Sequence, residues 1–134
     1  MLITGFPAGM LACNCYVLAP RQGADAIVVD PGQRAMGPLR KILDDNRLTP
    51  AAVLLTHGHI DHIRDAAAFG VETFVHPADA FMLLRGDGVS EQARELHDAS
   101  GMQPIDNPTP LADGQVLTVA GLQLRVVHAP GHSP

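Results

Sequence analysis

The chain has 134 residues, of which 46% are hydrophobic and 17% are charged, and its formal net charge at pH 7 is −5. This length and apolar content suit one packed domain spanning residues 1–134, and they exclude a disordered chain. The acidic balance makes nucleic acid an unsuitable main partner, because phosphate binding needs a surplus of Lys and Arg.

The sequence gives no sign of a membrane partner or of export. No apolar run approaches the roughly 18 residues that cross a bilayer. Residues 1–18 are apolar, but the first basic side chain is Arg21, so the basic segment of a signal peptide is missing. The two cysteines, Cys13 and Cys15, are too few for a disulfide framework, and we expect buried thiols. We therefore predict a cytoplasmic protein.

The first third of the chain predicts three strands and a helix. Residues 3–5 and 13–19 are expected to be strands around a turn at residues 6–9. The β-branched run 26–29 is expected to be a third strand. Apolar side chains close to helical spacing then predict a helix over residues 38–48.

Strands and short helices alternate through the middle of the chain. Residues 51–55 are an apolar strand candidate, and residues 63–69 are expected to be a short helix that a glycine ends. A strand over 71–75 and a helix over 77–84, with proline in its first turn, follow. One further helix is expected over residues 90–99, with a serine as its N-cap.

The chain closes with a predicted hairpin. Residues 115–119 and 122–128 flank Ala120-Gly121, which is a tight-turn signal. Leading strands, crossing helices and a closing antiparallel pair predict a mixed α/β protein with layers of sheet and helix.

The chemistry of the chain is concentrated directly after the predicted strand 51–55. Three histidines and an aspartate lie within six residues there: His57, His59, Asp61 and His62. Imidazole and carboxylate are the ligands that zinc prefers, and iron and manganese accept them as well. A solvated polar loop is the alternative interpretation, but such a dense cluster at a strand end favours metal binding.

The spacing of these four residues suggests two ions. In extended backbone, His57 and His59 point to the same side, whereas Asp61 and His62 begin the next helix and point elsewhere. One pair could therefore serve each ion, and two ions about 3.5–4 Å apart are a recurrent device of hydrolases.

A third histidine is expected to join His57 and His59 as a ligand of the first ion. His132 follows a Pro-Gly pair beyond the last predicted strand, so a loop can carry it across the molecule. His128 is predicted to lie within that strand and to be packed or hydrogen-bonded instead. Three protein ligands with one open position are the arrangement of a catalytic zinc.

These residues resemble the signature of the metallo-β-lactamase superfamily, and most closely its glyoxalase II-like branch of hydroxyacylglutathione hydrolases. Three segments carry the resemblance in order: Val28-Val29-Asp30-Pro31-Gly32, His57-x-His59-x-Asp61-His62 and Ala129-Pro130-Gly131-His132. The resemblance implies an αββα four-layer sandwich with a metal site at one edge of its paired sheets. It also implies that His57, His59 and His132 bind the first metal and that Asp61 and His62 bind the second.

The chain departs from the family pattern in two places. Family members continue past the Pro-Gly-His loop and supply a bridging aspartate and a further histidine, which have no counterpart within residues 1–134. The segment after His62 is also about one helical turn shorter than expected. We therefore expect the chain to be the N-terminal part of a longer protein.

The predicted activity is hydrolysis of a small-molecule thioester. A water held between two zinc ions would become a hydroxide near neutral pH and attack the carbonyl carbon. Asp61 is the predicted catalytic residue, because its carboxylate could accept a hydrogen bond from that water. Asp30 is expected either to orient a ligating imidazole or to cap its own turn. His76 and His97 are expected to be structural or solvated.

Two other functions remain open on the sequence. A single iron held by two histidines and a carboxylate would suit a persulfide dioxygenase-like enzyme. A non-catalytic module is the other alternative. The sequence does not identify the acyl group, the thiol carrier or the oligomeric state.

Overall fold

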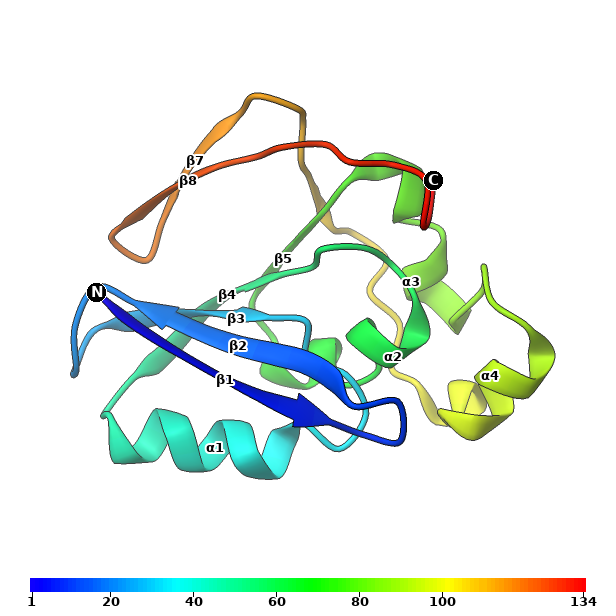
Figure 1. Cartoon of the computed structure of the whole chain (residues 1–134), viewed down its shortest axis with the longest axis horizontal. Helices are drawn as coiled ribbons and strands as arrows, with labels where there is room; N and C mark the ends of the chain where they lie inside the picture. The colour runs from blue at the N-terminus through cyan, green and yellow to red at the C-terminus, as the bar shows by residue number, and fades with distance from the viewer.

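A computed structural model describes all residues from Met1 to Pro134. Its centre is a six-stranded sheet in which the strands lie side by side in chain order (Figure 1). The strands are β1 (Leu2–Ala8), β2 (Cys13–Ala19), β3 (Asp25–Val29), β4 (Thr49–Leu54), β5 (Glu72–Val75) and β6 (Thr109–Pro110).

The sheet is antiparallel at one side and parallel at the other. β2 pairs antiparallel with both β1 and β3, whereas β3, β4, β5 and β6 run parallel to one another. Because the carboxyl ends of parallel strands meet at one edge of a sheet, the loops that follow β3, β4 and β5 lie at the same edge. The first residue of β2 lies at this edge too.

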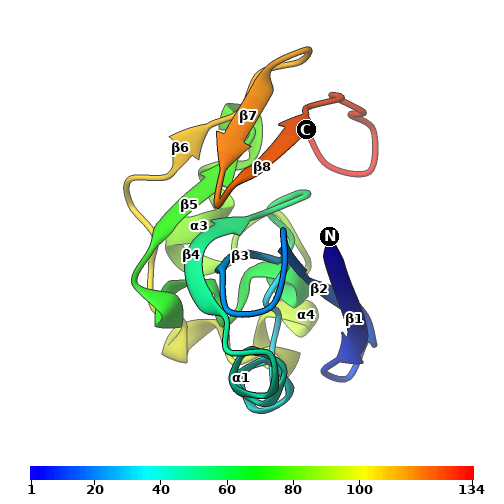
Figure 2. The same cartoon turned by 90° about the vertical axis from the view of Figure 1, so that its left-hand side faces the viewer.

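Helices cover one face of this sheet. The inward residues of the strands, such as Val17, Val28 and Val53, form the main core with Leu39 and Leu43 of helix α1 (Met36–Asp45). Figure 2 shows α1 beneath the sheet, on the side away from the C-terminal hairpin. The alternation of buried side chains along the strands therefore supplies two apolar faces, of which this is the first.

The second face is covered by a hairpin of β7 (Val116–Val119) and β8 (Leu122–Arg125), which pair antiparallel. Leu117 packs against Ala52 and Phe74, and Leu122 packs against Ile27 and Val29. Leu18 of β2 also packs against this cluster, whereas Ile3 of the edge strand β1 is 59% exposed. Three layers of the predicted αββα sandwich are therefore confirmed: the helices, the six-stranded sheet and the hairpin. Residues 1–134 form no second helical layer.

Short helical segments connect the strands. They are α2 (Ile60–Ile63), η1 (Ala66–Phe69), η2 (Pro77–Asp79), α3 (Met82–Arg85), α4 (Glu91–Leu96) and η3 (Ala99–Gly101). The helices predicted over 63–69 and 77–84 are each split in two, and Gly70 and Gly86 end the second pieces with left-handed backbone. The predicted cap of α4 is confirmed, because Ser90 Oγ accepts a hydrogen bond from Ala93 N. No helix is long and apolar enough to span a membrane.

Several predicted boundaries were wrong. The turn expected at residues 6–9 lies later, because β1 is an edge strand and tolerates Pro7 within it. The helix predicted over 38–48 ends at Asp45, because Arg47 takes a left-handed conformation. β8 ends at Arg125, so His128 lies beyond the strand and not within it.

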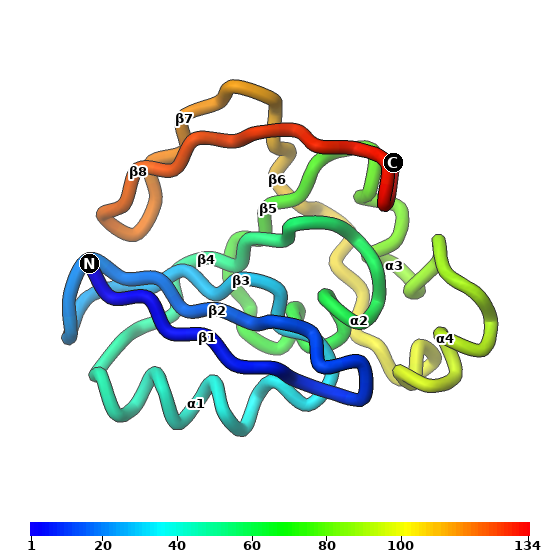
Figure 3. The backbone as a smooth tube through the Cα atoms, in the orientation of Figure 1, coloured from blue at the N-terminus to red at the C-terminus, as the bar shows by residue number.

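After β8 the chain runs back over the sheet. Figure 3 shows this tail, residues 126–134, passing from the hairpin to the end of the molecule where β4 leads into α2. The tail therefore brings the last residues of the chain to the edge at which β3, β4 and β5 end.

Replacing Gly32 with alanine is expected to destabilise the protein. Gly32, in the loop after β3, lies directly against the backbone of α2, and an added Cβ would overlap the carbonyl oxygen of Asp61. Relieving that overlap should cost about 1–3 kcal/mol of unfolding free energy. Urea denaturation followed by circular dichroism measures the loss.

The matched control is Gly37→Ala in α1, where nothing lies within 4 Å of the added carbon. This change should leave stability unchanged or raise it by about 0.4–1 kcal/mol. Equal effects of the two substitutions would contradict the close approach of Gly32 to α2.

Candidate metal centre

Titratable side chains gather at the edge where the parallel strands end. Asp30 directly follows β3, His57 comes three residues after β4, and His76 directly follows β5. Cys13, the first residue of the antiparallel β2, reaches the same edge. The sheet topology thus brings together groups that are far apart in the sequence.

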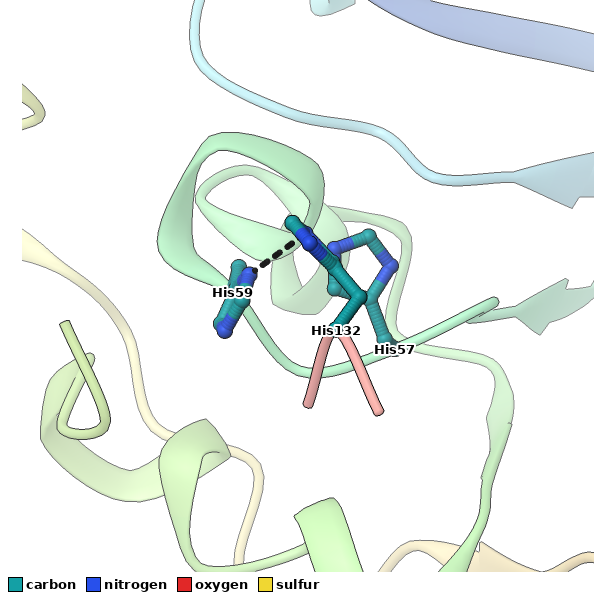
Figure 4. Close-up of side chains that lie close together, drawn as sticks. All are labelled: His57, His59 and His132. Atoms are coloured by element: carbon teal, nitrogen blue, oxygen red, sulfur yellow. Dashed lines mark hydrogen bonds between the residues drawn. The ribbon is translucent and has the colours of Figure 1, made fainter. Parts of the chain in front are cut away.

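Three imidazoles converge at this edge. His57 and His59 come from the loop between β4 and α2, and His132 comes from the tail (Figure 4). His59 Nδ1 and His132 Nε2 are 3.1 Å apart, and the ring centroids of His57 and His132 are 4.9 Å apart. One nitrogen from each ring lies within 4.8 Å of the others. The structure therefore brings these three predicted site residues together.

The protonation of His57 suits a metal ligand. The Thr56 hydroxyl donates a hydrogen bond to Asp30 Oδ2 at 2.6 Å, so Thr56 Oγ1 can only accept from a second partner. That partner is His57 Nδ1, which lies 3.0 Å from Thr56 Oγ1. Nδ1 is then the N–H donor of that ring, and Nε2 keeps a lone pair. His57 Nε2 is buried and has no hydrogen-bond partner. A bound cation would satisfy this nitrogen.

Electrostatics keep the first two imidazoles neutral. Burial lowers the pKa of His57, and the positive charge of His62 lowers it further. Burial also lowers the pKa of His59, with a further contribution from His132. Since only neutral imidazole can donate a lone pair, the donor set fits a metal ion.

Asp30 organises the loop that carries these histidines. Its side chain is almost fully buried; Oδ1 accepts a hydrogen bond from Thr56 N at 2.8 Å, and Oδ2 accepts from Thr56 Oγ1. Oδ2 also lies 2.8 Å from His62 Nδ1. Asp30 was expected either to orient an imidazole or to cap its own turn. Its side chain contacts an imidazole, that of His62, so the first role is the one observed.

His62 contacts Asp30 and Cys13 through one ring nitrogen and faces Asp61 with the other. Burial lowers its pKa, but the hydrogen bond that Nδ1 donates to the Asp30 carboxylate and the contact with Cys13 outweigh burial and raise the pKa to about 10. Cys13 Sγ lies 3.2 Å from Nδ1. Nε2 faces Asp61, whose Oδ2 is 3.4 Å away.

The predicted site residues thus form two neighbouring groups. His57, His59 and His132 make the first, and Asp61 and His62 lie beside each other next to it. Ligand atoms of Asp30, His57 and His62 also lie within 4.8 Å of one another, so the ring of His57 links the two groups.

The remaining histidines lie elsewhere. His128 stacks on His76, with ring centroids 4.0 Å apart and planes 5° from parallel. His76 has a structural role, because its Nδ1 accepts a hydrogen bond from Ala78 N at the start of η2. Of the two roles expected for His97, the structural one is observed: it is buried at the end of α4, its Nδ1 lies 2.9 Å from the Ala93 carbonyl oxygen, and its own carbonyl accepts a hydrogen bond from Arg64.

Sequence reasoning missed two contacts of the site. Asp79 is buried at the end of η2, and its Oδ2 accepts hydrogen bonds from Gly58 N and Ser133 Oγ. Cys13 is buried, as predicted, but it also contacts His62. The position of Asp79 shortly after a parallel strand was the one available signal. Cys15 is a buried thiol, and burial raises its pKa to about 12.

A pocket of about 570 Å³ opens beside the three imidazoles. His57 and His132 line one end, and the apolar side chains Leu54, Leu117 and Leu124 line the part between the sheet and the hairpin. An organic molecule placed there would have polar atoms at the imidazoles and apolar atoms between the layers.

The sequence model of the metallo-beta-lactamase superfamily matches residues 8–134. The chain belongs to this superfamily. Members bind metal ions, so the cluster of His57, His59 and His132 lies in a fold that is built around a metal site. The resemblance recognised from the histidine motif is therefore confirmed.

Two curated relatives within the superfamily show its range. The chain is 54% identical over 139 residues to an uncharacterized protein of Mycobacterium tuberculosis (strain ATCC 25618 / H37Rv), covering 99% of this chain and 62% of that protein. It is 31% identical over 143 residues to the hydroxyacylglutathione hydrolase GloC of Haemophilus influenzae, covering 100% of this chain and 63% of that protein.

Two solved metallo-beta-lactamase-like structures are similar. One is TTHA1623 in a di-iron-bound form, with a TM-score of 0.76, 29% identity and coverage of 98% of this chain and 63% of that chain. The other is the BLEG-1 B3 metallo-beta-lactamase, with a TM-score of 0.74, 30% identity and coverage of 99% and 64%. The chain therefore spans slightly less than two thirds of the length of these relatives.

Replacing Thr56 with valine is expected to destabilise the protein by about 1–2 kcal/mol. The change keeps the side-chain shape but removes the hydroxyl that links Asp30 Oδ2 to His57 Nδ1, and a hydrogen bond to a charged group contributes about 1.5–3 kcal/mol. Urea denaturation of the metal-free protein measures this loss.

Thr73→Val is the control, because the Thr73 hydroxyl makes only a 3.3 Å bond to the neutral Val71 carbonyl. It should cost less than about 1 kcal/mol. If valine at position 56 costs no more than valine at position 73, the hydroxyl does not hold the loop.

Proposed function

We propose that the protein containing this chain is a metal-dependent hydrolase of thioesters. The observation that carries the proposal is the convergence of His57, His59 and His132, in which the buried His57 Nε2 has no hydrogen-bond partner. The hydroxyacylglutathione hydrolase named among the relatives supports a thioester as the substrate.

We propose zinc as the metal, with His57, His59 and His132 as ligands of one ion and Asp61 and His62 as ligands of a second, which would take the place of the proton on His62 Nε2. Zinc accepts imidazole nitrogen and carboxylate oxygen, which are the groups present. Iron is the alternative metal, since one similar structure is in a di-iron-bound form. Bound metal ions acidify water and polarise a carbonyl oxygen, which is the chemistry that thioester hydrolysis needs.

The protein's own residues prepare this site. Thr56 contacts His57 at Nδ1 and Asp30 contacts His62 at Nδ1, which leaves Nε2 of each ring for a metal ion. Asp61 accepts a hydrogen bond from the attacking water and orients it toward the carbonyl carbon. The pocket beside His57 and His132 holds the part of the substrate that does not react, and its apolar walls exclude water there.

Replacing His132 with alanine is expected to weaken binding of one zinc ion at least about 100-fold, because one of three ligands is lost. Competition with a chromophoric chelator measures the affinity and the number of ions bound. The matched control is His128→Ala, in the same tail but stacked on His76 outside the cluster. Equal zinc affinities of the two variants would contradict the proposed ligand set.

Replacing Asp61 with alanine is expected to lower kcat for a hydroxyacylglutathione thioester by about 100-fold or more, since positioned acid–base groups contribute about 10²–10⁴-fold. Steady-state kinetics of the whole protein, with metal content measured in parallel, provide the comparison. Asp44→Ala, an exposed carboxylate on α1, is the control. Unchanged turnover in the Asp61 variant would refute its role.

A further inference from the structure

Asp79 is a buried carboxylate that bridges two distant parts of the chain. It is 3% exposed, and a single oxygen, Oδ2, accepts hydrogen bonds from Gly58 N at 2.9 Å and from Ser133 Oγ at 2.6 Å. These donors are 21 and 54 residues away in the sequence. Asp79 forms no ion pair, and its other oxygen, Oδ1, is buried without a hydrogen-bond partner.

The two donors adjoin the three converging imidazoles. Gly58 lies between His57 and His59, and Ser133 directly follows His132. One carboxylate oxygen therefore holds both segments that supply the imidazoles. No other side chain forms hydrogen bonds with both of these segments.

The packing around Gly58 makes this contact rigid. A Cβ added at Gly58 would lie 2.9 Å from the Asp79 carbonyl oxygen and 2.9 Å from Met82 Sδ. The histidine loop is thus seated directly on the η2–α3 segment, and Asp79 comes from the same segment. By contrast, the tail residues Gly131 to Pro134 are mostly exposed, so the tail has little apolar packing of its own at this point.

The charge of Asp79 also favours a cation at the cluster. A buried carboxylate without a positive partner is costly, because desolvation is not repaid by an ion pair. The three imidazoles adjoin its two hydrogen-bond donors and could hold a compensating cation.

We propose that Asp79 is a positioning residue that fastens His132 of the tail to the His57–His59 loop, so that the three-histidine site is assembled before a metal ion arrives. The inference rests on the proposed function, because it takes these histidines to be metal ligands. It assigns to Asp79 no contact with substrate or with the ion.

The test measures zinc affinity of the whole protein by chelator competition for Asp79→Ala, Asp79→Asn and Ser133→Ala. Loss of a residue that orients ligands typically costs 10- to 100-fold in metal affinity, and we expect this loss for Asp79→Ala. Asp79→Asn should recover part of it, because the amide oxygen still accepts a hydrogen bond. Ser133→Ala should lose about fivefold.

A double-mutant cycle separates positioning from general destabilisation. Because both tail and loop bond to the same oxygen, adding Ser133→Ala to Asp79→Ala should weaken zinc binding by no more than a further twofold or so. Asp113→Ala is the control: Asp113 accepts a hydrogen bond from His128 N in the tail but does not touch the histidine loop. It should change zinc affinity less than threefold.

Amide hydrogen exchange of the metal-free protein gives a readout independent of zinc. The Gly58 amide should exchange faster in Asp79→Ala but not in Ser133→Ala, since only the former loses its acceptor. Wild-type zinc affinity in Asp79→Ala, additive losses in the double variant, or an equal loss in Asp113→Ala would each overturn the inference. Failure of the wild-type protein to bind zinc or iron would instead overturn the proposed function.

Discussion

The buried carboxylate of Asp30 is the interaction on which the site depends. It accepts hydrogen bonds from the backbone and the hydroxyl of Thr56 and lies 2.8 Å from His62 Nδ1, so it joins the end of β3 to the loop after β4 and to α2. Asp30 takes a left-handed φ of 52° to make these contacts. Without it, Thr56 and His62 would lose the hydrogen bonds that hold their two segments to the end of β3.

Parallel pairing of β3, β4 and β5 makes this interaction possible. Each strand brings the residues that follow it to the same edge: β3 contributes the carboxylate of Asp30, β4 the imidazoles of His57 and His59, and β5 the carboxylate of Asp79. Asp30 accepts hydrogen bonds from Thr56 at the start of the histidine loop, and Asp79 accepts one from Gly58 within it. Hydrogen bonds to Asp30 and Asp79 therefore hold the loop that carries His57 and His59.

The parts of the fold and site that local pattern determines were predictable from the sequence. Strand 13–19 matches because its side chains alternate between buried and exposed, and His132 lies with His57 and His59 as the motif implied. The rest depends on tertiary context. Pro7 fits a strand only because that strand is an edge, and Asp79 resembles an ordinary helix-capping residue until Gly58 and Ser133 are folded onto it.

The contact between His59 and His132 spans 73 residues, which makes it one of the most non-local contacts in the molecule. Closing a loop of that length carries an entropic cost of roughly 4 kcal/mol by the (3/2)RT ln n relation. Non-local contacts of this kind slow folding, because the loop must be closed before the contact contributes. An ion shared by the two rings would therefore link the tail to the loop after β4, and its removal would raise the conformational entropy of the tail.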